Sequence, residues 1–356
     1  MKKQIVAGIL IFTLCISSCI TGCDKNSKET GAGQENPVKV NTESQKQVEQ
    51  ENNTERPVPE ENKDWYKFNP VVKSPFYEKI IGKSAMKTYE NMVDAVMNYR
   101  DEFKVEKGVN WWSLGEIISY IFPQYYYVIE EVEQKDGTGH IKYLKDEAST
   151  REILSSFGEK VEWWINSCTQ ESEPDMLKSM EIYQKMAKEV EYNYDAIDPE
   201  KEAEQDVSPY NAIMHLNGIC QSFGSAYAYL LMQIGIDACP AGGLAEDNTA
   251  HEWTLLKLDD KWFYADPTFE NGTDSKRLYY FGMTTQRRYE EGSYVEKYIN
   301  VGNCNQVWGK DVEVNDDRFA QLMDIYDVKK MYADESYVYV EGLDFNNKMT
   351  TVKIKY

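Results

Sequence analysis

The most regular hydrophobic pattern of the chain begins at Gly218-Ile219-Cys220-Gln221. Apolar side chains then recur at the spacing of one helix face as far as Gly235: Phe223, Ala226, Tyr227, Leu230, Leu231 and Ile234. This period predicts a buried helix with Cys220 in its first turn. The unpaired N–H groups and the helix dipole at that end favour a thiolate over a thiol, so Cys220 is a candidate nucleophile. The alternative is a buried structural cysteine.

Two strand-like runs follow the predicted helix. Residues 251–258 and 261–267 flank Asp259-Asp260, which predicts an antiparallel hairpin with a two-residue turn. If that pairing continues along both runs, His251 and Asp266 share one face as diagonal neighbours, because side chains alternate with period two. A three-residue turn would instead put them on opposite faces.

Cys220, His251 and Asp266 together supply the parts of a nucleophilic cysteine site. The imidazole can take the thiol proton, and the carboxylate can fix the tautomer and stabilise the imidazolium. Attack on an amide or ester carbonyl would form a thioester, with the Cys220 backbone N–H holding the oxyanion. The spacing by itself identifies no acyl acceptor.

The chain resembles the transglutaminase-like superfamily in three motifs that occur in the family's order. These are Gly218-Ile219-Cys220-Gln221-Ser222-Phe223, then His251-Glu252-Trp253, then Trp262-Phe263-Tyr264-Ala265-Asp266-Pro267-Thr268. The resemblance covers about residues 175–275. It implies a Cys220-His251-Asp266 triad in a papain-like α+β core, in which the nucleophile helix packs on an antiparallel sheet.

The resemblance also suggests two accessory positions. Tyr210 stands where many relatives carry an aromatic residue and is a candidate oxyanion or accessory residue, with core packing as the alternative. Trp253 is a candidate for packing along the cleft. Glu252 replaces the small residue more usual after the histidine, and alternation predicts that it faces away from the triad. Family members include proteases, cross-linkers, amidases and catalytically dead relatives, so the resemblance implies fold and triad more firmly than substrate.

Other kinds of site find little support in the sequence. The net charge is −21, which argues against nucleic acid as a partner. With three histidines, no CxxC pair and no second histidine four positions after His251, we expect neither a metal site nor another cofactor. His215, five residues before Cys220, is a less favoured base that we expect to pack or face solvent.

The N-terminus has the pattern of an export signal. Lys2 and Lys3 precede an apolar run, residues 5–16, which is too short to span a membrane and is typical of a signal peptide. The run is followed by Ile20-Thr21-Gly22-Cys23, which resembles the lipobox of bacterial lipoproteins. That resemblance implies cleavage after residue 22 and lipidation of Cys23, hence a membrane anchor facing the extracytoplasmic side. An ordinary secretory signal is the alternative.

Residues 23–63 are expected to be a disordered tether. The segment 24–63 holds no aromatic residue, leucine or isoleucine, so it cannot bury enough apolar surface to fold. It carries nine acidic and six basic residues, and residues 1–23 carry two lysines, so about −20 of the net charge belongs to the remainder. An acidic folded part favours neutral or basic peptides over polyanions.

The remaining sequence predicts a core with two flanks. Residues 64–170 read as an α/β flank, with helices near 89–97 and 117–121, a buried strand at 125–129 and a hairpin turn at 136–139. A helical stripe over 176–192 opens the core, residues 171–300. Residues 301–356 are expected to be a β extension in which runs 336–340 and 350–355 pair around Asn346-Asn347.

From the sequence we expect an extracytoplasmic lipoprotein that hydrolyses an amide of a peptide or protein through a Cys220 thioester. Two alternatives remain open. One is a catalytically inactive binding or scaffold module that keeps the triad as a relic. The other is a cross-linking transglutaminase with an amine as acyl acceptor.

Overall fold

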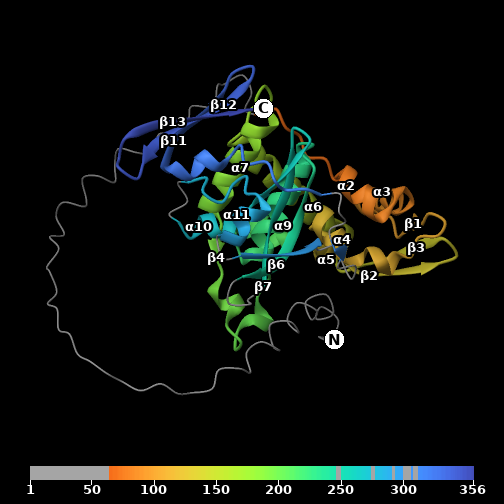
Figure 1. Cartoon of the computed structure of the whole chain (residues 1–356). Helices are drawn as coiled ribbons and strands as arrows, with labels where there is room; N and C mark the ends of the chain where they lie inside the picture. The colour runs from red at the N-terminus through yellow and green to blue at the C-terminus, as the bar shows by residue number, and fades with distance from the viewer. Residues whose placement is uncertain (1–63, 246–249, 274–276, 291–292, 300–305, 308–311) are drawn as a thin grey trace. The chain divides into compact units, whose positions relative to one another are not determined.

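The computed structural model describes residues 64–245, 250–273, 277–290, 293–299, 306–307 and 312–356 (Figure 1). The predicted signal peptide, Cys23 and the tether lie outside the described residues. Residues 64–356 form one compact unit. Within the described ranges, no helix has the length and apolar character needed to cross a membrane.

The core is helix α9 (Cys220–Gln233) packed on an antiparallel sheet of strand order β10-β9-β6-β7-β8. Its strands are β6 (Ala238–Ala245), β7 (Ala250–Leu258), β8 (Lys261–Ala265), β9 (Ser293–Ile299) and β10 (Gln306–Val307). At Gly224, a Cβ would lie 3.0 Å from the Trp253 carbonyl oxygen, so the absence of a side chain lets α9 approach β7 closely. Thr254 Oγ1 donates a hydrogen bond of 2.7 Å to the Gly224 carbonyl. The predicted buried helix and the α+β class are therefore confirmed.

The β7–β8 hairpin has the predicted register. Leu258 pairs with Lys261 across the two-residue turn, where Asp259 and Asp260 have φ of 47° and 61°. Two successive positive φ values are those of a type I′ turn, whose twist suits a hairpin. Pairing stops at Ala265 rather than continuing to the end of the run, because Pro267 opens helix α10 (Pro267–Asn271). Asp266 thus stands between strand and helix.

Residues 64–170 contain helices and a small sheet. The helices are α2 (Pro75–Ile81), α3 (Lys83–Met97), η2 (Trp111–Leu114), α4 (Gly115–Ile121), α5 (Tyr125–Val128) and α6 (Glu147–Asn166). Strands β1 (Glu102–Lys104), β2 (Ile129–Lys135) and β3 (Thr138–Tyr143) form a sheet of order β1-β3-β2. The predicted helices at 89–97 and 117–121 and the hairpin turn are confirmed.

The predicted strand at 125–129 is wrong, because residues 125–128 form a helical turn and the strand begins at Ile129. The three tyrosines explain the difference. The Tyr125 side chain is buried, with its ring centroid 6.3 Å from that of Trp111, and Tyr126 is exposed. The Tyr127 ring stacks on that of Tyr210, with centroids 3.7 Å apart. A helical turn sends successive side chains in three directions, whereas a strand offers two faces.

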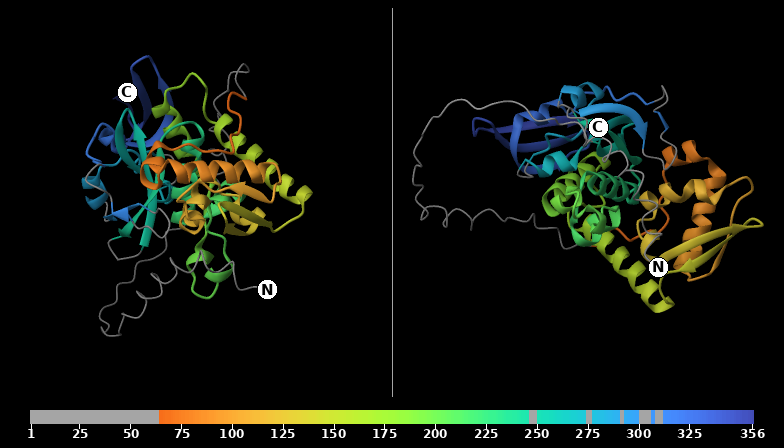
Figure 2. Two further views of the ribbon diagram at one scale, coloured as in Figure 1. Left: turned by 90° about the vertical axis from the view of Figure 1, so that its right-hand side faces the viewer. Right: turned by 90° about the horizontal axis from the view of Figure 1, so that it is seen from below.

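The described chain closes with the C-terminal sheet. Strands β11 (Ile325–Ala333), β12 (Tyr337–Asp344) and β13 (Met349–Lys355) are antiparallel in that order. Pairing of β12 with β13 confirms the predicted hairpin, and β11 adds a third strand that was not predicted. Figure 2 shows these strands, in blue, on the far side of the core from the orange N-terminal helices.

Five further elements lie between residues 175 and 290. Helix α7 (Asp175–Glu189) confirms the predicted helical stripe, and α8 (Pro209–His215) precedes the nucleophile loop. Short strands β4 (Glu191–Tyr192) and β5 (Asn217–Gly218) pair in parallel just before Cys220. Helix α11 (Thr285–Glu290) contributes a residue to the candidate active site.

Candidate active site

Cys220 is the first residue of α9 and is partly exposed. The preceding residue, Ile219, has no side-chain acceptor, so the N-cap side chain accepts none of the first-turn N–H groups. Ser222 Oγ accepts the Ile219 N–H at 3.1 Å and donates to the Val207 carbonyl at 2.8 Å. At Gly218, a Cβ would stand 2.3 Å from Ser222 Cβ, which explains why glycine is needed there. These contacts hold the sulfur at a helix end whose N–H groups favour negative charge.

His251 lies near the start of β7 and is 7% exposed. Its Nε2 is 2.7 Å from Asp266 Oδ2, so Nδ1 is the ring nitrogen that Cys220 can reach. A hydrogen bond with the Cys220 side chain is among the interactions that raise the pKa of His251. The Phe269 ring stacks on the imidazole with centroids 4.4 Å apart and planes 14° apart. The ring is therefore fixed by contacts on its edge and on its face.

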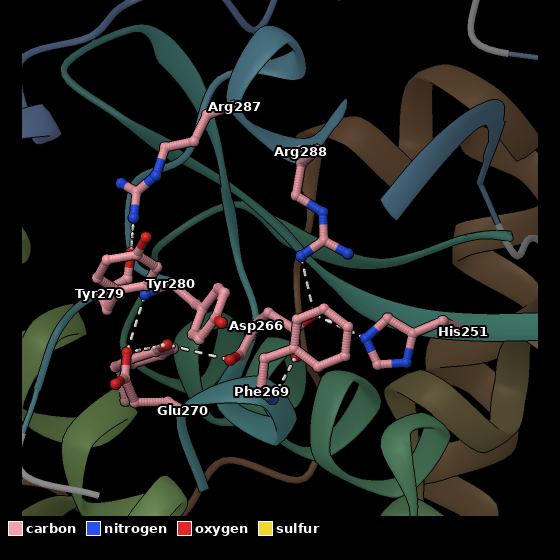
Figure 3. A network of polar contacts seen from close by, with 9 residues as sticks. His251, Asp266, Phe269, Glu270, Tyr279, Tyr280, Arg287 and Arg288 are labelled. Carbon is pink, nitrogen blue, oxygen red and sulfur yellow. Dashed lines mark hydrogen bonds and ion pairs between the residues drawn. The ribbon is translucent and has the colours of Figure 1, made fainter. Parts of the chain in front are cut away.

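Asp266 is fully buried, and both its carboxylate and its backbone make hydrogen bonds (Figure 3). Its Oδ1 accepts the Phe269 N–H at 3.0 Å, which caps α10, while Oδ2 meets both His251 and Arg288 Nη1, the latter at 2.8 Å. The backbone is held as well. Its N–H donates to the Tyr280 carbonyl at 3.0 Å, and its carbonyl accepts the Tyr183 hydroxyl at 3.0 Å.

The electrostatics of the pair keep both partners charged at neutral pH. Burial, the largest influence, would lower the pKa of His251, but the Asp266 carboxylate and then Cys220 outweigh it and raise this pKa to about 9. Burial would likewise raise the pKa of Asp266, yet His251 and Arg288 hold it well below its ordinary value. An imidazolium beside the cysteine is the arrangement that stabilises a thiolate.

A second buried carboxylate supports the Asp266 segment from behind. Glu270 Oε2 accepts the Tyr183 hydroxyl at 3.0 Å and the Tyr280 N–H at 2.9 Å, and burial raises the pKa of this carboxyl. Tyr183 therefore bridges Glu270 to the Asp266 backbone. Glu252, by contrast, lies on the other face of β7 and accepts a hydrogen bond of 2.6 Å from Ser225, away from the triad as alternation predicted.

The accessory candidates lie in packed surroundings. Tyr210 is 6% exposed, and its ring stacks between Tyr127 at 3.7 Å and Phe157 at 5.4 Å. Trp253 is fully buried behind His251, with ring centroids 5.9 Å apart. His215 is exposed at the end of α8.

Sequence reasoning missed Arg288, Phe269 and Tyr183. Phe269 could have been found, because it stands three residues after a carboxylate that begins a helix. Arg288 carries no local signal, since it lies 22 residues beyond Asp266 in a short helix beside another arginine. Tyr183 looks like any core residue of an amphipathic helix. Across the described ranges, no group of three or more His, Cys, Asp or Glu side chains is arranged to hold a metal ion.

Residues 163–267 match the model of the transglutaminase-like superfamily core, so this part of the chain is a transglutaminase-like domain. The match includes Cys220, His251 and Asp266 and stops short of Arg288. No curated protein matches the sequence.

Three solved structures are similar to parts of the chain. A Cytophaga hutchinsonii protein provisionally described as a cysteine protease is 20% identical over 26% of this chain and 30% of its own, with a TM-score of 0.22. A TGase is 15% identical over 49% and 46%, with a TM-score of 0.30. Legionella pneumophila LapG is 15% identical over 35% and 64%, with a TM-score of 0.24. The chain thus spans less than two thirds of each of these proteins, and none of the likenesses assigns it an activity.

Proposed function

We propose that this protein is a cysteine-dependent hydrolase of amide bonds in peptides or proteins. The observation that carries the proposal is the buried 2.7 Å contact between His251 and Asp266. Cys220, at the N-terminus of α9, is hydrogen-bonded to the same imidazole. The transglutaminase-like fold of residues 163–267 supports thiol chemistry in general.

The proposed reaction has two stages. The Cys220 thiolate attacks the amide carbonyl carbon, a C–S bond forms, and the oxyanion faces the first-turn N–H groups of α9. The C–N bond then breaks as the His251 imidazolium gives its proton to the leaving amine, which leaves a thioester. Water attacks the thioester while neutral His251 accepts its proton, the C–S bond breaks, and a carboxylic acid and the starting thiolate–imidazolium pair result. Asp266 holds the imidazole orientation throughout.

Mass spectrometry of peptide mixtures tests this proposal. The purified protein and its Cys220→Ser variant are incubated with proteome-derived peptides, with and without a primary amine such as dansylcadaverine. Cys220-dependent products that gain one water support hydrolysis. Cys220-dependent uptake of the amine in place of water would instead establish cross-linking. No change in any peptide, together with an unreactive Cys220, would contradict catalysis and favour a binding module.

An acidic segment whose two ends adjoin the nucleophile loop supports a neutral or basic substrate. Tyr192 pairs beside the Cys220 loop, and the exposed Tyr194 that follows it leads into an acidic segment, residues 195–206. A peptide that carries lysine or arginine next to the reacting amide gains from this field, and the gain is screened by salt. Activity that rises as negative charge is added to a peptide series would refute this part of the proposal.

The N-terminal pattern supports a lipid anchor, and we propose Cys23 as the lipidated residue. Two acyl chains on this cysteine would give stable attachment to the membrane, with the tether placing the hydrolase on the extracytoplasmic side. Metabolic labelling with an alkyne fatty acid tests the anchor. We expect labelled protein in the membrane fraction and loss of both label and membrane retention in Cys23→Ala. Unlabelled protein in the soluble fraction would refute it.

A further inference from the structure

Arg288 brings a fully buried cation to the carboxylate of the candidate triad. Its Nη1 is 2.8 Å from Asp266 Oδ2, the same oxygen that His251 contacts. Its guanidinium carbon lies 4.2 Å from the centre of the Trp253 ring and 5.4 Å from that of Phe269. In the described part of the chain, Asp266 is its only carboxylate partner, and its Nε and Nη2 donate no hydrogen bond. The positive charge of this buried arginine therefore offsets the negative charge of the Asp266 carboxylate.

Charge counting shows what this cation does to the site. Arginine stays protonated in proteins. When Cys220 and His251 share one proton between them, Asp266 and Arg288 cancel and the four groups are neutral overall. With two shared protons the cluster carries +1, and with none it carries −1. Without Arg288 the two-proton state would be the neutral one, and the one-proton state would carry −1 in a buried site, which is costly.

We propose that Arg288 is a positioning residue that makes the one-proton state of Cys220 and His251, to which the thiolate–imidazolium pair belongs, the electrically neutral state of the buried cluster. The inference rests on the proposed cysteine chemistry for its purpose, but the effect on His251 exists whether or not the protein turns over a substrate. Arg288 also keeps Asp266 ionised, so that the carboxylate can orient the imidazole.

Other titratable groups face the cluster from four elements. They are Tyr183 from α7, Tyr192 from β4, Tyr264 from β8 and Glu270 from α10. Burial raises the pKa of all four, to about 12 for Tyr192 and Tyr264, so the tyrosines stay neutral over the pH range of interest. Arg288 lowers the pKa of Tyr264, so its removal leaves this tyrosine still neutral, and differences between Arg288 variants in the neutral to mildly alkaline range therefore report on the guanidinium.

The adjacent arginine offers a matched control. Arg287 is also buried, at 7% exposure, but its guanidinium donates to the Tyr279 carbonyl and lies 5.0 Å from the Tyr279 ring (Figure 3). Arg287→Gln thus removes a buried cation from the same helix without touching Asp266.

The test is an NMR titration of His251 in the wild type, Arg288→Gln, Arg288→Lys and Arg287→Gln. The chain has three histidines, so ¹³C-histidine labelling gives three resonances, which His251→Ala assigns. We expect the pKa of His251 to rise by about 1 or more in Arg288→Gln, because a nearby cation no longer opposes protonation. Arg288→Lys should give a smaller rise, since its shorter side chain holds the charge further from Asp266, and Arg287→Gln should give none.

The rate of Cys220 alkylation against pH gives a second readout. In Arg288→Gln, the acid limb and the alkaline limb of the alkylation rate profile should both move to higher pH. A move of one pH unit lowers the alkylation rate on the acid limb about tenfold. An unchanged His251 titration in folded Arg288→Gln overturns the inference, as does a lower rate with unmoved limbs, which is the signature of a merely structural role. If the Gln variant does not fold, an unchanged His251 titration in Arg288→Lys overturns it instead. Failure of the proposed cysteine chemistry is distinct, because wild-type Cys220 would then react as an ordinary thiol.

Discussion

Replacing Asp266 by asparagine removes the negative charge that pairs with Arg288. Both side chains are fully buried, and Arg288 Nη1 lies 2.8 Å from the carboxylate. Breaking a buried ion pair by removing one partner costs about 3–5 kcal/mol, because the other charge stays buried without compensation. Loss of the helix cap does not add to this cost, since asparagine caps the Phe269 N–H about as well as aspartate.

The double variant Asp266→Asn/Arg288→Met separates this cause from general damage to the core. It removes both charges and keeps most of the volume of the arginine side chain, so no uncompensated cation remains. We expect the double variant to be at least about 1 kcal/mol more stable than Asp266→Asn alone, although it carries one more substitution. The partly exposed pair of Asp316 and Arg318 provides the control, because Asp316→Asn should cost no more than about 1 kcal/mol.

Urea unfolding at pH 7 measures these differences. Tryptophan fluorescence and circular dichroism should give coincident transitions, and equal m-values across variants would show that stability alone changed. Additive losses, with the double variant less stable than Asp266→Asn by the full cost of Arg288→Met, would refute the claim that Asp266 compensates the Arg288 charge. A cost below about 1 kcal/mol for Asp266→Asn would refute it as well.

Three further predictions concern stability and the geometry of the core. Because folding raises the pKa of His251, the stabilisation that its protonation gives is complete below the unfolded pKa of about 6.5 and is lost as pH rises toward about 9. The free energy of unfolding of the wild type should therefore fall by about 3 kcal/mol over that range. In His251→Ala it should stay flat there. A wild type that is equally stable at both ends of the range would contradict the raised pKa. Gly224→Ala forces a Cβ against the Trp253 carbonyl and should cost about 1–3 kcal/mol in urea unfolding, whereas a neutral outcome would mean that α9 and β7 are further apart. Glu252→Gln keeps a partner for Ser225 on the face away from His251, so the pH profile of Cys220 alkylation should not move, and a shifted profile would place Glu252 in the site.

Much of the core followed from local patterns in the sequence. The helix from Cys220 was predictable because its apolar period runs without a break to Gly235. The turn at Asp259-Asp260 set the hairpin register as far as Thr254 and Ala265, and His251 and Asp266 meet just beyond the end of that ladder. The strand predicted at 125–129 failed because three aromatic residues in a row fit either period, and tertiary packing decided between them.

What the sequence could not supply is the long-range part of the site. Arg288 lies in α11, 22 residues after Asp266, and only tertiary folding brings the two side chains together. No spacing rule links the two positions. Phe269 and Tyr183 act through stacking and through a hydrogen bond to backbone, and neither contact requires a recognisable residue pattern. Local periodicity therefore identified the reacting groups, and the contacts that set their charge and orientation came from tertiary structure.

The rate of iodoacetamide labelling at Cys220, followed by peptide mass spectrometry from about pH 5 to 9 with and without His251→Ala, tests the central claim most directly. Burial raises the pKa of Cys168 and Cys239, so neither should compete at low pH. An ordinary thiol of pKa about 8.5 is about 0.3% thiolate at pH 6. An activated Cys220 should therefore label on the order of 100-fold faster there than His251→Ala does. Labelling of the wild type that follows an ordinary thiol titration and is unaffected by His251→Ala would contradict the claim that these residues form an activated pair.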